Sequence, residues 1–157
     1  MTSSTSLNLF EVERKDPPIL GFFGEYRFLS NYHLCTCLVY DIPFKSSEHA
    51  YMYQKSLDPE YQQRIIHAET PKDAKKIGSN VKLRPDWDYY RKTAMLIALQ
   101  AKFKNIPERD MLLATGDAYL EETNYWKDTY WGVCNGVGLN NLGEILMKIR
   151  FWLQATK

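Results

Sequence analysis

The stretch SSEHAYMYQKSL, residues 46–57, combines the pattern of a half-buried helix with an unusual set of polar side chains. A serine at either of the first two positions can cap a helix, which is predicted over about 47–57. One face of this helix, at offsets of three, four and seven residues, carries Glu48, Tyr51, Met52 and Lys55. This face is either a partly exposed stripe with a weak charge pair, or a carboxylate and an amine that project into a cleft for acid–base or covalent chemistry.

Short strands and several helices are predicted on either side of this segment. The stretches 19–29 and 35–46 are rich in β-branched and aromatic residues and are predicted to be strands, the second with a turn at Asp41–Pro43. Proline positions, N-caps and apolar spacing predict further helices at about 59–68, 71–78, 86–104, 107–116 and 141–154, and further strands at 118–122 and 130–134. The expected fold is α+β, a mostly helical single domain around one small β-sheet containing parts of 19–29, 35–41 and 130–134.

Length and composition are those of an ordinary globular domain. The chain has 157 residues and a net charge of +1, which argues against a long DNA-binding face or a membrane surface but allows a compact nucleotide site. We expect a flexible N-terminal arm at 1–18 and a single domain at 19–157. The expected location is intracellular and cytoplasmic, or nuclear in a eukaryote, because no signal peptide is visible and the cysteine count is odd. The sequence gives no indication of oligomeric state.

The cysteines have two interpretations. Cys35 and Cys37 lie near His33 and could belong to a metal site, but one intervening residue does not match the usual spacing of structural zinc ligands. The favoured interpretation is two free thiols on one side of a strand. No metal and no cofactor are therefore expected.

A second polar and aromatic concentration is NYWKDTYWG, residues 124–132, in which Asp128 lies between Trp126 and Trp131. Two tryptophans in a polar turn either pack beneath the loop or stack on a ligand. Two carboxylates between aromatic walls suit the cleavage of a glycosidic bond, and the rings suit stacking on a base.

Seven segments, taken in order, resemble the NADAR family: FLSNYH (28–33), SSEHAYMYQK (46–55), TPKDAKKIG (70–78), LRPDW (83–87), LLATG (112–116), DTYWG (128–132) and GLNNLGEILMKIR (138–150). The resemblance covers about residues 19–153. It implies the family's fold and the hydrolysis of an N-glycosidic bond at a ribose. It also implies active-site roles for the residues at the family's motif positions.

The predicted site combines that resemblance with the residue patterns. The catalytic set is Glu48, Lys55 and Asp128. The substrate-binding set is Ser30, Asn31, His49, Tyr51, Arg84, Trp87, Trp131, Gly132 and Asn140. In this interpretation Trp87 and Trp131 bracket the ribose and the leaving base, while Glu48 or Asp128 handles protons. Lys55 is either a nucleophile that forms a Schiff base with the opened sugar or a charge partner of Glu48.

The resemblance implies two substrates. Some family members act on phosphorylated ribosylamino-pyrimidine intermediates of riboflavin synthesis, and others remove ADP-ribose from modified guanine in DNA. One riboflavin-type member has a loop rich in His and Lys, whereas the corresponding loop here, VCNGVGL (133–139), has no cation. Glycine N–H groups and the N-terminus of the last helix would instead bind a diphosphate, which favours an ADP-ribose-type ligand and ADP-ribosylated DNA as partners. The alternative classes are a non-catalytic ADP-ribose- or NAD-binding module and a structural partner subunit. No membrane partner is expected.

Overall fold

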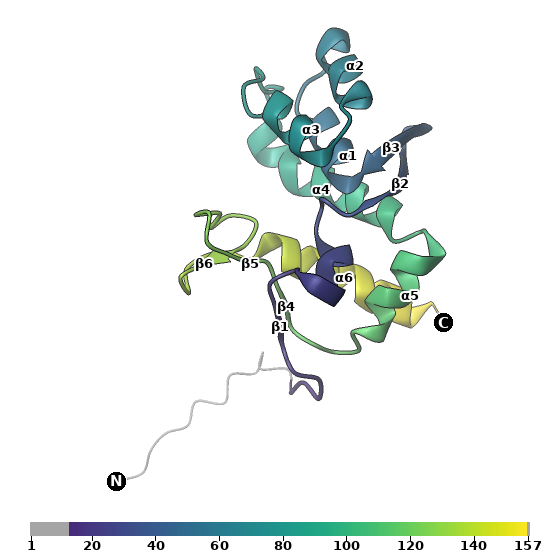
Figure 1. The fold of residues 1–157 in the computed structure, drawn as a ribbon, viewed down its shortest axis with the longest axis vertical. Helices are drawn as coiled ribbons and strands as arrows, with labels where there is room; N and C mark the ends of the chain where they lie inside the picture. Colours follow the sequence, from purple (N-terminus) through teal and green to yellow (C-terminus); the bar gives the residue numbers. More distant parts are fainter. Residues whose placement is uncertain (1–12, 157) are drawn as a thin grey trace.

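The computed structural model describes residues 13–156, which form helices and short strand pairs (Figure 1). The helices are α1 (Ser47–Tyr53), α2 (Pro59–His67), α3 (Pro71–Gly78), α4 (Trp87–Lys102), α5 (Ile106–Ala114) and α6 (Asn141–Ala155), with a 3-10 helix, η1 (Gly24–Leu29). The strands are β1 (Ile19–Leu20), β2 (Leu34–Val39), β3 (Ile42–Ser46), β4 (Leu120–Glu121), β5 (Thr123–Asn124) and β6 (Val133–Cys134). The predicted α+β, mostly helical architecture is confirmed.

Three helices begin at the polar residues that the sequence offers as caps. The side chain of Ser46 accepts a hydrogen bond from the backbone N–H of His49 at the start of α1. Asp58 and Thr70 accept equivalent bonds at the starts of α2 and α3, and each is followed by a proline at the first helical position. These side chains satisfy N–H groups that the first helical turn leaves without partners, so local chemistry fixes these helix starts.

The single small sheet predicted from the sequence is wrong. The described strands form three separate pairs: β2 with β3 antiparallel, and β1 with β4 and β5 with β6 parallel. The strand predicted at 19–29 is reduced to β1, because Gly21 and Gly24 adopt positive φ angles of 88° and 58° and the chain then turns into η1. The predicted turn in 35–46 lies at Tyr40 and Asp41, which both have positive φ and close a tight hairpin.

The elements form two neighbouring groups in space (Figure 1). Helix α1 packs against α2, α3, α4 and the β2–β3 hairpin in one group, and α6 packs against α5 and β4 in the other. Helix α4 also packs against α6, so the two groups share one hydrophobic core. Among the described residues, no helix has the length and apolar character needed to cross a bilayer.

The first described residues are tied to the segment before β4. The backbone N–H groups of Lys15 and Asp16 donate to the carboxylate of Asp117, at 2.8 and 2.9 Å, and the N–H of Asp117 donates back to Asp16. This reciprocal contact continues into the β1–β4 pair, where Ile19 lies opposite Leu120. Residues 1–12 of the expected arm lie outside the described residues.

Candidate active site

A cleft of ≈ 770 Å³ separates the face of α1 from the segment that runs from β4 to β6. Helix α1 contributes Glu48, Tyr51 and Met52, and the facing segment contributes Glu122, Trp126, Asp128 and Trp131. The third wall comes from η1 and its flanks, with Phe22, Phe23, Arg27, Ser30, Asn31 and Tyr32. The structure therefore brings all three residues of the predicted catalytic set, Glu48, Lys55 and Asp128, into one cleft.

Glu48 lies in the first turn of α1 and is only 6% exposed. Burial raises the pKa of its carboxyl to about 7; Lys75 and Lys55 oppose this change and the charge of Asp128 adds to it. A carboxyl group with a pKa near neutrality is divided between its acid and base forms at pH 7. Glu48 can therefore donate or accept a proton under physiological conditions.

Lys55 lies just beyond α1, which ends at Tyr53 rather than near residue 57. Its backbone N–H bonds to the carbonyl of Met52 in a tighter turn, and its ammonium group donates to the carbonyl of Gly78 at 3.4 Å. Burial lowers the pKa of Lys55, although the negative charge of Glu48 opposes the change. Lys55 is therefore not part of the helix, contrary to the prediction, but the turn still places its amine in the cleft. The lowered pKa increases the fraction of the amine that is neutral.

Asp128 organises the loop between β5 and β6. Its Oδ1 accepts hydrogen bonds from the backbone N–H groups of Tyr130 and Trp131, at 3.2 and 2.9 Å. Asn124 holds the same residue from the other side by accepting from its N–H and donating to its carbonyl. Asp128 is therefore fixed in place, with one carboxylate oxygen used by the loop and its charge directed into the cleft.

Glu122 is a third carboxyl group in the cleft, which the sequence-based site did not include. Burial raises its pKa to about 7, and the charge of Asp128 adds to the effect. Its Oε2 is buried and has no hydrogen-bond partner among the described residues. The sequence could have indicated this residue through the pair Glu121–Glu122. Neighbouring side chains of an extended segment point to opposite sides, so one of the two glutamates faces inward.

The aromatic walls differ in one respect from the prediction. Tyr51 and Trp131 line the cleft with their rings edge to face, 5.5 Å apart between centroids. Trp87 is buried behind Tyr51, at 5.4 Å between ring centroids, and is not among the lining residues. Trp126, which is 46% exposed, lines the cleft instead. Trp87 therefore packs on Tyr51 from the core and does not line the cleft.

Ser30 and Asn31 join the wall formed by η1 to the start of α1. The side-chain oxygen of Asn31 accepts a hydrogen bond from Ser47 Oγ at 2.8 Å, and its backbone carbonyl accepts from the N–H of Glu48. The carbonyl of Ser30 accepts from the buried Lys102 ammonium at 2.8 Å. Both residues line the cleft, so the structure places them where a ligand can reach them.

His49 and Arg84 lie outside the cleft lining, contrary to expectation. His49 is fully buried on the opposite side of α1, where its ring bonds to Ser46 Oγ and to the carbonyl of Ala68. Arg84 pairs with Asp86 and stacks on the ring of Tyr90. Adjacent residues of a helix point in different directions, which separates His49 from Glu48.

Gly132 and Asn140 also lie outside the lining, but they hold Glu122 in place. The side chain of Asn140 accepts from the N–H of Glu122 at 3.0 Å and donates to the carbonyl of Leu120 at 2.9 Å. A Cβ at Gly132 would lie 2.2 Å from the carbonyl oxygen of Glu122, so only glycine allows this close approach. Both residues act on the cleft through the Glu122 backbone.

The cations of the cleft are Arg27, Lys55 and Lys75. The loop 133–139 does not line the cleft, so its lack of cations does not decide phosphate binding. The N–H groups of Asn141 and Leu142 at the start of α6 bond to the carbonyls of Tyr130 and Trp131. These two N–H groups at the start of α6 are therefore already paired with carbonyls, whereas the side chains of Arg27 and Lys75 line the cleft. Lys75 lies in the quoted TPKDAKKIG segment, whose residues were not assigned a role.

Comparisons with known proteins identify the family and the fold. The NADAR domain family matches residues 21–154. N-glycosidase YbiA of Shigella boydii is 36% identical over 146 residues, covering 88% of this chain and 91% of that protein. N-glycosidase Npun_R5314 of Nostoc punctiforme is 36% identical over 132 residues, covering 80% and 84%. The riboflavin biosynthesis protein VVA0006 of Vibrio vulnificus is 37% identical over 131 residues, which is 81% of this chain but only 35% of that protein.

A solved structure shares the fold. The NMR structure of the Escherichia coli protein YbiA superimposes with a TM-score of 0.81 and 32% identity, covering 94% of this chain and 90% of that one. The fold and the cleft thus define a hydrolase of the N-glycosidase class. The chain belongs to the NADAR family.

Proposed function

We propose that this N-glycosidase removes ADP-ribose from modified guanine bases in DNA, by hydrolysing the bond between the ribose C1 and a guanine nitrogen. The observation that carries the proposal is the convergence of Glu48, Glu122, Asp128 and Lys55 in one aromatic cleft. Two of the three carboxyl groups have a pKa of about 7. The cleft therefore supplies both a proton donor and a negative charge at neutral pH.

Breaking the C1–N bond needs a proton on the leaving nitrogen and stabilisation of positive charge at C1. A protonated Glu48 or Glu122 supplies the proton, and the side chain of Asp128 stabilises the sugar cation. Water that attacks C1 then loses its proton to the carboxylate that has just become a base. The three groups complete the hydrolysis without any consumed reagent other than water.

Lys55 offers a covalent route to the same products. Its neutral amine attacks C1 as the bond to guanine breaks, the sugar ring opens with its oxygen protonated, and a Schiff base remains. Water hydrolyses the imine and returns the free amine and the sugar aldehyde. The lowered pKa of Lys55 supports this route because only the neutral amine is nucleophilic.

The outer part of the cleft favours a substrate larger than a ribose monophosphate. Phe23 and Trp126 line the cleft and remain 49% and 46% exposed, so their rings are open to stacking on a second base. Arg27 and Lys75 supply two positive charges for a diphosphate. An ADP-ribosyl group has both parts, an adenine and a diphosphate.

The second candidate substrate is a phosphorylated ribosylamino-pyrimidine intermediate of riboflavin biosynthesis. It is favoured by the name of the Vibrio vulnificus relative, a riboflavin biosynthesis protein of which this chain spans about a third. The same carboxyl groups would protonate its leaving amine, and a single phosphate would need only one of the two cations.

The deciding experiment incubates the protein with an oligonucleotide carrying ADP-ribosylated guanine and, separately, with the ribosylamino-pyrimidine phosphate. Chromatography follows the release of ADP-ribose in the first reaction and of the pyrimidine in the second, with Glu48→Gln as the inactive control. We expect kcat/KM to be higher for the ADP-ribosylated oligonucleotide. A higher value for the pyrimidine would assign the second substrate, and no release from either would contradict both.

A further inference from the structure

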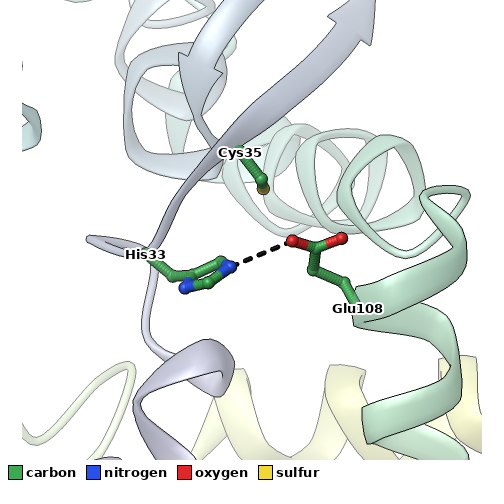
Figure 2. Close-up of side chains that lie close together, drawn as sticks. All are labelled: His33, Cys35 and Glu108. Carbon is green, nitrogen blue, oxygen red and sulfur yellow. Dashed lines mark hydrogen bonds and ion pairs between the residues drawn. The ribbon is translucent and has the colours of Figure 1, made fainter.

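Three side chains of the types that bind transition metals meet outside the cleft, where β2 and α5 begin (Figure 2). His33 Nε2 lies 3.0 Å from Glu108 Oε1, and the Cys35 thiol points toward the same space. The three ligand atoms all lie within 4.8 Å of one another. The C-x-C spacing considered in the sequence does not describe this cluster, because its third member lies far along the chain and Cys37 is not part of it.

We propose that His33, Cys35 and Glu108 bind a zinc ion, with a water molecule as the fourth ligand. Zinc takes imidazole nitrogen, thiolate sulfur and carboxylate oxygen at bond lengths of about 2.0–2.3 Å, which places ligand atoms of a tetrahedron roughly 3.3–3.8 Å apart. The observed separations, 3.0 Å for one pair and at most 4.8 Å for the others, bracket this range. Small side-chain rotations therefore suffice to complete the site.

The backbone holds the three donors close together in the absence of metal. His33 is fixed by the hydrogen bond from its N–H to the carbonyl of Ser30, in the turn that follows η1. Glu108 lies in the first turn of α5. The side chain of Asn105, which precedes α5, donates to the carbonyl of Thr36 in β2 at 2.7 Å and so joins the two elements that carry the ligands. Such preorganisation lowers the conformational cost of binding.

A hydrogen-bonded pair of His33 and Glu108 is the competing explanation of the same geometry. One imidazole N–H satisfies one oxygen of a carboxylate that is almost fully buried, whereas a zinc ion would compensate its charge directly. The buried Lys102 ammonium interacts with Cys35 and Glu108 and repels a second cation. We therefore expect reversible zinc binding, weaker than in a four-cysteine structural site.

The ion also has a route to the site. His33 lines a hollow of ≈ 700 Å³ together with Tyr32 and Arg27, and these two neighbours also line the reaction cleft. Metal that enters through this hollow reaches the exposed edge of the histidine ring first. One sulfur, one nitrogen and one oxygen donor suit zinc, and copper is the principal competitor because such sites bind it more tightly.

The test is a titration of tag-free, chemically reduced protein with zinc in competition with a chromophoric chelator. Cobalt is added in a second series, because its visible absorption reports tetrahedral coordination and its ultraviolet charge-transfer band reports a bound thiolate. We expect one ion per chain in the wild type. Cys35→Ser and His33→Ala should each lower zinc affinity by at least about tenfold, the smallest effect usual even for residues that only support a ligand.

Matched variants at the same residue types provide the controls. Cys134→Ser and His67→Ala remove a thiol and an imidazole that lie outside the cluster, and both should bind zinc as the wild type does. Circular dichroism without metal establishes that each variant is folded, and the partly exposed His33 remains testable if Cys35→Ser does not fold. Equal affinity in wild type and His33→Ala, or a cobalt complex without thiolate charge transfer, would overturn the proposal in favour of the hydrogen-bonded pair.

Discussion

Glu48 and Glu122 line the same cleft from opposite walls. Burying either carboxylate in its ionised form costs free energy, because the charge loses its hydration. Their pKa values of about 7 show that the fold tolerates partly protonated carboxyl groups there. Glu48 belongs to α1 and Glu122 follows β4, so the two carboxyl groups are carried by different elements. At the residue scale, the main property of the site is therefore the protonation state of Glu48 and Glu122. Substitution of these residues and changes of pH both test it.

The first prediction is that Glu48→Gln lowers kcat by about 10² or more, the usual contribution of a positioned acid or base. Glutamine keeps the size of the side chain and cannot deliver a proton as an acid. The melting temperature near pH 7 should not fall, because the change removes a charge that burial disfavours. Glu60→Gln, on an exposed part of α2, is the matched control and should leave kcat unchanged. Full activity in Glu48→Gln would remove Glu48 from the mechanism.

The second prediction concerns stability and pH. The folded state raises the pKa of Glu48 from 4.5 to about 7, so between these values the folded protein binds more protons than the unfolded chain. The contribution of Glu48 to stability is present below about pH 4.5 and is lost as pH rises through 7, by at most roughly 3 kcal/mol. Thermal unfolding at pH 5 and pH 8 should therefore show Glu48→Gln gaining stability relative to wild type at the higher pH. A difference that is constant across this range would contradict the raised pKa.

The third prediction is that Lys55 forms a covalent adduct. Borohydride added during turnover, or with ADP-ribose alone, should reduce the Schiff base and increase the mass of the protein by the sugar portion. Peptide mapping should locate that mass on Lys55, and Lys55→Arg should abolish it because a guanidinium stays protonated. Lys76→Arg is the control, since Lys76 does not line the cleft. No trapped mass, with high activity in Lys55→Ala, would leave direct attack by water.

At the scale of elements, the β5–β6 pair places the acidic wall of the cleft. The N–H of Val133 donates to the carbonyl of Glu122 at 2.9 Å, and a Cβ at Gly132 would lie 2.2 Å from that same oxygen. The backbones at Glu122 and Gly132 can therefore approach this closely only because Gly132 has no side chain. Any increase in the separation displaces the backbone of Glu122, whose carbonyl is the group in contact.

The fourth prediction follows from that contact. Gly132→Ala should lower kcat by more than tenfold, because a displaced acid loses its alignment with the reacting bond, and should destabilise the protein by about 1–3 kcal/mol. Gly136→Ala is the control: its φ of 76° strains an alanine, but no atom lies within 4 Å of the new Cβ. It should lose stability by roughly 1–2 kcal/mol and keep kcat. Equal losses of kcat in both variants would contradict the assignment of the Gly132→Ala effect to displacement of Glu122.

Local signals in the sequence predicted most helices, whereas the choice of Glu48, Lys55 and Asp128 as the catalytic set rested on the resemblance to the NADAR family. Thr70 followed by Pro71 specifies the start of α3 by itself. The seven-residue spacing of Glu48 and Lys55 placed both side chains on one face of the predicted helix, although α1 ends before Lys55. The strand pairs were not predictable in the same way, because each of β1, β4, β5 and β6 has two residues and depends on a distant partner. His49 was misplaced because its motif gives proximity in sequence but not the side of the helix.

At the scale of the whole molecule, the cleft lies between the two groups of elements seen in Figure 1. Glu48 and Lys55 belong to the group around α1, and Asp128 and Trp131 to the group around α6. A ligand that fills the cleft would contact residues of both groups. The effect of ligand binding on backbone stability should therefore be detected in both groups of elements and not in one segment alone.

The fifth prediction uses hydrogen exchange to measure this effect. Saturating ADP-ribose should protect backbone amides in both 48–55 and 122–131, and should raise the melting temperature, because a ligand that binds only the folded state stabilises it. Trp131→Ala should weaken the protection in both segments together. Protection confined to one segment would indicate that the ligand does not bridge the cleft.

The parallel pairing of β1 with β4 has a consequence for how the enzyme is made. The neighbouring contact between Asp16 and Asp117 spans 101 residues, so this junction closes only after the residues up to β4 have left the ribosome. Helix α1 and its glutamate are synthesised before Glu122, Asp128 and α6. A nascent chain thus carries the Glu48 wall of the cleft before the facing wall with Glu122 and Asp128 has been made. The complete cleft forms only when these segments, which are far apart in the sequence, pack against each other.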